Sequence, residues 1–221
     1  MPDFEELPFF QRPDLTPYLI HLTRNTKTEN GRSAFKNLVK ILQTGRIRGS
    51  ENKKGKGYIK GPNRAACFMD VPFYALKYVL NAQDSDPDDP RYEAFGIFVI
   101  KKNAYKKGCR PVLYLSNKEL KNLGIPKNEW WRVVRLEADG ESWISWLHER
   151  EWRAKGDYPL SPKPGVLVKN SNYAEKLRKL LDDEPEKFKV RPRTVIPLTI
   201  VCQGLPHLPR TRKRKKERAG S

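Results

Sequence analysis

The sequence predicts an α+β domain with short strands and few helices. Three observations lead to this class: short apolar runs rich in β-branched and aromatic residues, two segments with amphipathic helical spacing, and no internal repeat. The chain has 221 residues, which suffices for one core. We expect a single α+β, catalytic-like domain over residues 17–205, between an irregular arm at 1–16 and a disordered basic tail at 206–221.

The first half of this domain is expected to alternate strands and helices. Ser33 can cap the start of a helix, and Gly45 can take the left-handed conformation that ends one. The glycine- and lysine-rich stretch that follows holds no phosphate-loop pattern and is expected to be a basic loop. The expected elements are a strand at 18–23, a helix between Ser33 and Gly45, a loop at 46–64, a strand at 65–69 and a helix at 73–80.

The second half is expected to contain three more strands and one more long helix. The five tryptophans all lie between Trp130 and Trp152. With the arginines among them they could form a stacking platform for single strands, although tryptophans belong more often to the core. The expected elements are an acidic loop at 84–90, strands at 95–100, 111–115 and 194–201, and an amphipathic helix at 172–182.

The formal net charge of +18 is the strongest bulk signal. The last twelve residues contribute +6, which leaves +12 for the rest. A basic surface of this size attracts phosphates and makes nucleic acid the expected macromolecular partner, with general solubility as the alternative. The tail residues expected to contact nucleic acid are Arg210, Arg212, Lys213, Arg214, Lys215, Lys216 and Arg218.

The cysteines and the ends of the chain indicate the compartment. Cys67, Cys109 and Cys202 are odd in number and lack metal-ligand spacing, so the sequence predicts reduced thiols, no disulfide framework and no zinc site. The N-terminus does not resemble a signal peptide, and no apolar run approaches the roughly 18 residues of a membrane span. We therefore expect a cytoplasmic protein that does not bind membranes.

Three segments carry the residue types that chemistry would need. They are Ile20-His21-Leu22-Thr23 followed by Leu38-x-x-Ile41-Leu42-x-x-Gly45, then Cys67-Phe68-x-Asp70-x-Pro72, then Glu151-Trp152-Arg153. The order of these motifs resembles that found in a set of bacterial abortive-infection (phage-defence) proteins. It is similar, more loosely, to the DNA-targeting ADP-ribosyltransferase toxins, which share the His-x-Thr opening and a Val-Pro-Phe-Tyr stretch. The resemblance covers roughly residues 17–155.

The resemblance implies an ADP-ribosyltransferase-like fold, in which two small facing sheets clasp NAD in a cleft. Cleavage of the nicotinamide–ribose bond passes through an oxocarbenium-like state, which a nearby carboxylate stabilises. Glu151 matches the family's late glutamate, and Glu149 would address the acceptor; on one strand the two would share a face. The alternative for both is a solvated charge run.

The resemblance also implies residues that hold NAD, without a metal. His21 would hydrogen-bond the ribose, and Thr23 would help to hold nicotinamide. The sequence lacks a clear tyrosine in the family's second motif, where many such enzymes stack nicotinamide, and Tyr74 could take that role. Arg64 could reach the pyrophosphate as a fork-shaped donor. The plainer alternatives are a strand histidine bonded to the backbone and, for Arg64, an ordinary loop residue.

The resemblance thus predicts an NAD-consuming ADP-ribosyltransferase that acts as a toxin or phage-defence effector, with nucleic acid among its acceptors. The alternative is a non-enzymatic regulator of the same fold that binds nucleic acid or a partner protein such as an antitoxin. A metal nuclease built on Asp70, Glu151 and Lys155 fits poorly, because the usual E-x-K spacing is missing. Convergence of His21, Thr23 and Glu151 on one pocket would favour the enzyme.

Overall fold

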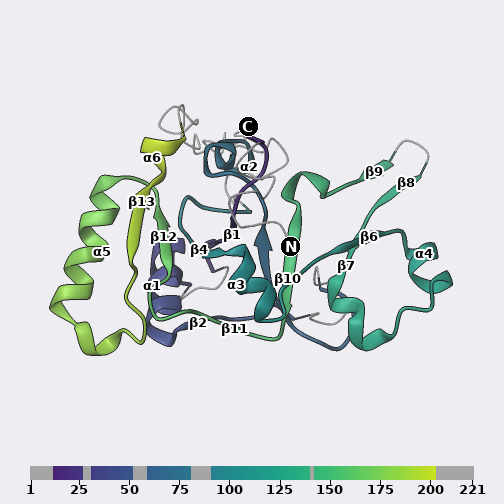
Figure 1. The fold of residues 1–221 in the computed structure, drawn as a ribbon, viewed down its shortest axis with the longest axis horizontal. Coiled ribbons are helices and arrows are strands. Elements are labelled where there is room, and N and C mark those ends of the chain that lie inside the picture. Colours follow the sequence, from purple (N-terminus) through teal and green to yellow (C-terminus); the bar gives the residue numbers. More distant parts are fainter. Residues whose placement is uncertain (1–11, 27–30, 52–58, 81–90, 140–141, 203–221) are drawn as a thin grey trace, which may run out of the picture.

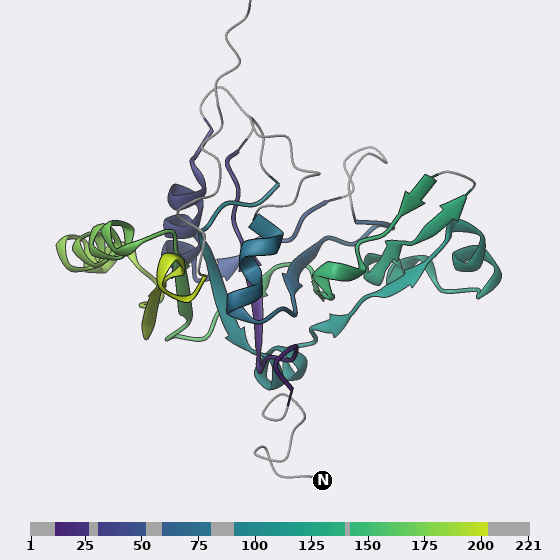
Figure 2. The same ribbon diagram turned by 90° about the horizontal axis from the view of Figure 1, so that it is seen from above.

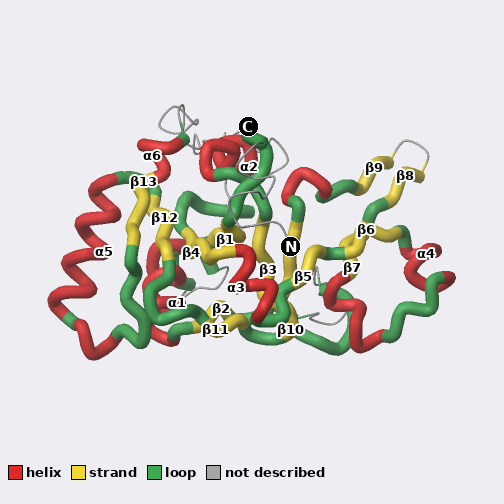
Figure 3. Tube along the Cα trace, viewed as in Figure 1, coloured by secondary structure: helices red, strands yellow, loops and turns green. Residues whose placement is uncertain are grey.

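A seven-stranded sheet organises the computed structural model, which describes residues 12–26, 31–51, 59–80, 91–139 and 142–202. Its strands follow the order β13-β12-β4-β1-β3-β10-β5, from left to right in Figure 3. Neighbouring strands are antiparallel, apart from the parallel pair β12 and β13. The strands are β1 (Tyr18–Leu22), β3 (Ala65–Met69), β4 (Gly96–Ile100), β5 (Arg110–Pro111), β10 (Glu151–Lys155), β12 (Gly165–Val168) and β13 (Thr194–Pro197).

Three strand pairs and several short helices complete the described part of the chain, as Figure 3 shows by colour. The pairs are β2 (Arg46–Ile47) with β11 (Tyr158–Pro159), β6 (Leu113–Leu115) with β7 (Val133–Arg135), and β8 (Glu137–Asp139) with β9 (Ser142–Ile144). The α-helices are α1 (Ala34–Thr44), α2 (Leu76–Leu80), α3 (Lys101–Lys106), α4 (Asn117–Asn122), α5 (Ser171–Asp183) and α6 (Leu198–Val201). The 3₁₀ turns are η4 (Phe73–Ala75), η5 (Lys127–Arg132), η6 (Leu147–Glu149) and η7 (Pro185–Lys187).

Both faces of the main sheet are covered by apolar side chains. On one face Leu19 and Phe68 pack into a core that includes residues of α1, α3 and α5. On the other face Ile20 and Met69 pack with residues of α2 and α6. Helices α5 and α4 lie at opposite ends of the molecule in both views (Figures 1 and 2). Because successive side chains of a strand point to opposite faces of the sheet, two residues can contact each other across strands only when they share a face.

The sequence predicts the helix α1 well, because its signals are local. Ser33 caps it by accepting a hydrogen bond from the backbone N–H of Lys36 at 3.3 Å. Gly45 ends it with φ of +66°, and its N–H donates to the carbonyl of Ile41. The predicted α+β class with few helices is confirmed as well.

Other expectations need correction. The strand predicted at 194–201 ends at Pro197, and Leu198–Val201 form α6; a short apolar run fits either structure. The strand predicted at 111–115 is broken at Val112, between β5 and β6. Instead of two small facing sheets, one large sheet forms, because β1 pairs with both β3 and β4.

Some predicted segments lie outside the described residues. These are most of the arm at 1–16, the acidic loop at 84–90, part of the loop at 46–64, and the tail at 206–221 with its seven candidate phosphate contacts. Among the residues that the structure does describe, no helix is long and apolar enough to span a bilayer.

Candidate active site

A sharp bend separates the two predicted catalytic glutamates. Arg150 has φ of +46° and ψ of +52°, the left-handed region that a residue with a Cβ rarely adopts. It lies between Glu149, at the end of η6, and Glu151, the first residue of β10. The backbone N–H of Asp70 holds the bend by donating to the carbonyls of Glu149 and Arg150, at 3.3 and 3.2 Å. The expectation that both glutamates share one strand face is therefore wrong.

Glu151 is buried and held by Arg153. Nε of Arg153 donates to Oε1 of Glu151 at 2.8 Å, and Nη2 donates to Oε2 at 3.1 Å. The same guanidinium donates through Nη1 to the carbonyls of Trp131 and Val133. Both charged side chains are nearly inaccessible to solvent, so the solvated charge run considered as an alternative is not what forms here.

Glu149 is buried with a separate set of partners. Arg91 forms an ion pair with its Oε1 at 3.1 Å, and the hydroxyl of Tyr92 donates to Oε2 at 3.3 Å. Burial raises the pKa of Glu149, the charge of Arg91 opposes this, and the charge of Glu151 adds to it. The two carboxylates are thus close enough to interact.

A third group, Cys67, lies beside the glutamates. Burial raises the pKa of its thiol, and the neighbouring Glu151 carboxylate raises it further. A thiol in this environment stays protonated and is a poor nucleophile. We therefore regard Cys67 as a neutral neighbour of the Glu151 carboxylate and assign it no covalent role.

The titration of Glu149 gives a testable pH dependence. Its folded pKa is raised above the ordinary value of 4.5, so the stability linked to this group is present below that pH and is lost as pH rises through the folded pKa. Glu149→Gln cannot titrate. We expect the melting temperature of the wild type, relative to this variant, to fall as pH rises above the ordinary value of 4.5. Thermal melts at a series of pH values measure it, and a constant difference would contradict the assignment.

One ring nitrogen of His21 hydrogen-bonds the backbone, as expected for an ordinary strand histidine, and the other nitrogen is left to bind a ligand. Its Nδ1 lies 2.8 Å from the carbonyl oxygen of Cys67. Burial lowers the pKa of His21, with the Cys67 carbonyl opposing, so the neutral ring is favoured. A carbonyl only accepts, so Nδ1 carries the proton and Nε2 presents a lone pair. His21 can therefore accept one hydrogen bond from a ligand hydroxyl.

The other predicted NAD-binding residues make contacts within the protein. The hydroxyl of Thr23 is buried within hydrogen-bonding distance of two carbonyls, Ala34 at 2.9 Å and Phe95 at 3.1 Å. The hydroxyl of Tyr74, whose side chain is exposed, donates to the carbonyl of Pro13 at 2.6 Å.

Arg64 lies far from the glutamates. Arg64 directly precedes β3, and its guanidinium donates to the carbonyl of Gly49 and the carboxylate of Asp157. Glu151 instead pairs with Met69, the last residue of β3. Five residues of strand separate the two positions by roughly 17 Å.

The sheet register also separates His21 from Glu151. Ile20, Met69 and Glu151 are partners in one row and share a face of the sheet. His21, one residue further along β1, points to the other face, where its ring lies 6.0 Å from that of Phe68. The structure thus brings Glu149 and Glu151 together, but it places His21 on the other sheet face and Arg64 at the far end of β3.

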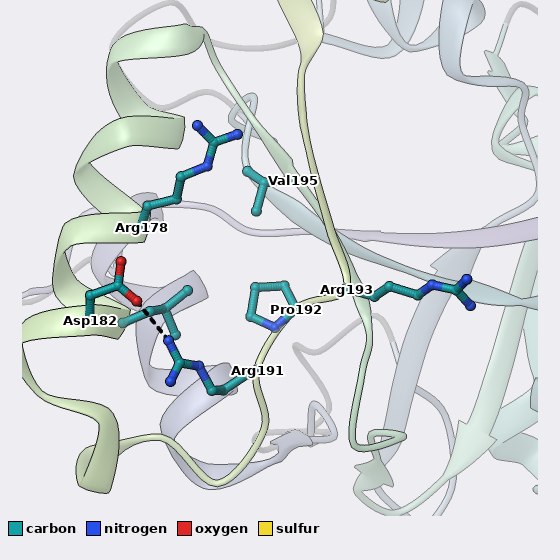
Figure 4. Close-up of a pocket in the computed structure, with 7 residues that line it drawn as sticks. Arg178, Asp182, Arg191, Pro192, Arg193 and Val195 are labelled. Carbon is teal, nitrogen blue, oxygen red and sulfur yellow. Dashed lines mark hydrogen bonds and ion pairs between the residues drawn. The ribbon is translucent and has the colours of Figure 1, made fainter.

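A hollow of about 240 Å³ lies elsewhere, between α5 and β13 (Figure 4). Arg191 and Asp182 form an ion pair at its edge at 2.8 Å, and Arg193 points away from it (Figure 4). None of the predicted site residues lines it. Within the described ranges, no group of three His, Cys, Asp or Glu side chains could hold a metal ion.

Sequence reasoning placed Arg153 in a solvated charge run with the glutamates, where the structure buries its pair with Glu151, and it missed Arg91 and Tyr92. Arg153 is part of the third motif and follows Glu151 by two positions, so strand alternation could have suggested the pair. Arg91 and Tyr92 lie 57 residues or more before Glu149, and no local pattern marks them.

Comparison with known proteins gives only a distant likeness. No family model and no curated protein matches the sequence. Solved structures of DarT from Thermus sp. 2.9 are similar to the chain. DarT in complex with NAD+ has 16% identity and a TM-score of 0.45, with 82% of this chain and 96% of that chain covered. DarT in complex with ADP-ribosylated ssDNA has 15% identity and a TM-score of 0.45, with 82% and 94% covered.

Proposed function

We propose that this protein is an NAD-consuming ADP-ribosyltransferase that acts as a toxin or phage-defence effector, with nucleic acid as its acceptor. The observation that supports the proposal is the pair of buried carboxylates, Glu149 and Glu151, each held by its own partners at the start of β10. Burying two like charges together is unfavourable, which makes such a pair a candidate for a chemical role.

In this proposal Glu151 supplies negative charge to the reacting ribose. The bond between nicotinamide and the ribose carbon breaks with its electron pair leaving on nicotinamide, and positive charge develops on the ribose. Arg153 fixes Glu151 before the reaction, so its carboxylate needs no reorganisation as that charge develops. The two hydrogen bonds from Arg153 occupy about half of the roughly four lone-pair sites of a carboxylate. The remainder can face a ligand.

Glu149 would serve the acceptor. An acceptor hydroxyl or amine loses a proton when it attacks the ribose carbon, and a nearby base must take that proton. The raised pKa of Glu149 brings the carboxylate closer to the working pH range of a general base. The resemblance also assigns a hydroxyl of NAD to Nε2 of His21; because His21 lies on the sheet face opposite to Glu151, that hydroxyl would belong to a part of NAD other than the ribose at Glu151.

A non-enzymatic regulator that binds nucleic acid or a partner protein remains the second candidate. The internal contacts of Thr23, Arg64 and Tyr74 favour it, as does the position of His21 on the face opposite to Glu151. The net charge of +18 suits either function.

NAD binding is the first test. Saturating NAD should raise the melting temperature by about 5–10 °C at a hundredfold excess over Kd, because a ligand that binds only the native state stabilises it. His21→Asn keeps an N–H for the Cys67 carbonyl but loses the Nε2 acceptor, and should abolish most of this rise. Tyr74→Phe, which alters only the contact with Pro13, is the control and should keep the rise.

Turnover is the second test. Full-length protein is incubated with NAD labelled in the adenosine part, without added metal, and with DNA, RNA or protein as acceptor. Label on nucleic acid supports the proposal. An unchanged melting temperature with NAD, together with no nicotinamide release with any acceptor, would replace it with the regulator.

A further inference from the structure

A strongly basic surface lies on and after the short helix α3. Residues 94–118 contain six lysines and arginines and no aspartate or glutamate. Lys102 precedes Tyr105 by three positions and Lys106 by four on α3, so it neighbours both on the helix surface. Ala104 is fully buried against the core on the other side. The exposed side of α3 therefore presents two lysines and an aromatic ring together.

Tyr105 is half exposed, and a guanidinium covers part of its ring. Its relative exposure is 51%, and the guanidinium carbon of Arg110 lies 3.8 Å from the ring centroid. Nη1 of Arg110 is fixed by donating to the carbonyls of Tyr105 and Cys109 at 2.7 and 2.8 Å. The Arg110 guanidinium over the Tyr105 ring is a cation–π contact, and both groups can stack with a base.

The cations of this surface carry uncompensated charge. Lys101 pairs with Asp70 at 2.8 Å, but within the described residues Lys102, Lys106 and Arg110 have no carboxylate partner. The ammonium of Lys107 lies toward β11, where it donates to the carbonyl of Pro159 and lies 5.4 Å from the ring centroid of Tyr158. The three remaining positive charges beside an exposed ring match the composition of single-strand binding grooves.

We propose that Lys102, Tyr105, Lys106 and Arg110, the Tyr105 surface, bind a single-stranded nucleic acid. A base stacks on Tyr105, and the three cations contact the phosphates. Paired bases in a duplex are already stacked and cannot use the ring in this way, so a single strand is the occupant that the ring favours.

The Tyr105 surface begins close to Asp70 but is separate from the candidate active site. Lys101, the first residue of α3, pairs with Asp70, whose backbone N–H holds the bend at Glu149 and Arg150. Because α3 packs on the sheet face opposite to Glu151, a strand on the Tyr105 surface lies outside the candidate active site. The binding itself needs neither NAD nor catalysis, so it goes beyond the proposed function.

The stacking is tested by comparing two oligomers that differ only in their bases. Full-length protein without NAD is titrated into a labelled thymidine strand of about twelve nucleotides and into an abasic strand of the same length. Both present the same phosphates to the basic tail. We expect the wild type to bind the thymidine strand about tenfold more tightly, Tyr105→Ala to lose this preference, and Tyr105→Phe to keep it.

Tyr78 on α2 provides the matched control. It is more exposed than Tyr105, at 69%, and also lies beside a cation, with Nζ of Lys77 5.0 Å from its ring centroid. Tyr78→Ala should keep the preference for bases. The proposal is overturned if Tyr105→Ala keeps it too, or if the wild type binds the abasic strand equally well.

The charges are tested by salt dependence. Lys102→Gln with Lys106→Gln should lower the slope of log affinity against log salt by about 1.4 on single strands, at roughly 0.7 per phosphate contact. The control is Lys36→Gln with Lys40→Gln, an exposed pair of the same spacing on α1. An equal decrease in both double variants would overturn the assignment to α3. Nicotinamide release without nucleic acid should be normal in all of them, which separates this proposal from the catalytic one.

Discussion

Arg153→Met is expected to lower the free energy of unfolding by about 3–5 kcal/mol, the range found when one partner of a buried ion pair is removed. The substitution leaves the Glu151 carboxylate buried without its counter-ion. It also removes the donor shared by the carbonyls of Trp131 and Val133. Denaturant unfolding monitored by tryptophan fluorescence measures the change.

Two further variants show whether the unpaired charge is the cause. Glu151→Leu combined with Arg153→Met removes both charges and should recover a large part of the lost stability. Arg191→Met breaks an exposed ion pair with Asp182 and should change the free energy of unfolding by about 0–1 kcal/mol. If Arg153→Met were no more destabilising than Arg191→Met, the buried pair would not hold the start of β10.

The elements that the sequence predicts correctly depend on neighbouring residues. Ser33 and Gly45 delimit α1 because capping involves groups within one helical turn. The strand at 65–69 is an apolar run bounded by a loop and a proline. The Glu-x-Glu spacing predicted a shared strand face that does not form, because the left-handed bend at Arg150, where the sequence has no glycine, places Glu149 outside the strand.

The rest depends on contacts between distant segments. Arg91 and Tyr92 reach Glu149 only because β4 and β10 belong to one sheet, which no local pattern specifies. His21 and Glu151 lie on opposite faces because of the register of β1, β3 and β10, and a shift of one residue would reverse this. Sequence alone gives the residue types of such a site but not their mutual orientation.

The substitution expected to affect activity most is Glu151→Gln. We expect the rate of nicotinamide release to fall about 10²-fold or more, the scale seen when one preorganised electrostatic group is lost. The amide keeps the size of the side chain and one oxygen that can accept from Arg153, but it has no negative charge to oppose the charge that develops on the ribose. Because that charge is specific to the transition state, the affinity for NAD should change little.

Glu149→Gln distinguishes the role of Glu149 from that of Glu151. If Glu149 serves the acceptor, its loss should slow transfer to nucleic acid more than it slows hydrolysis of NAD, whereas Glu151→Gln should slow both equally. Nicotinamide release and labelled nucleic acid are measured in parallel for each variant, after melting curves show that both are folded. A Glu151→Gln protein that binds NAD and releases nicotinamide at the wild-type rate would show that this carboxylate only anchors Arg153 in the fold.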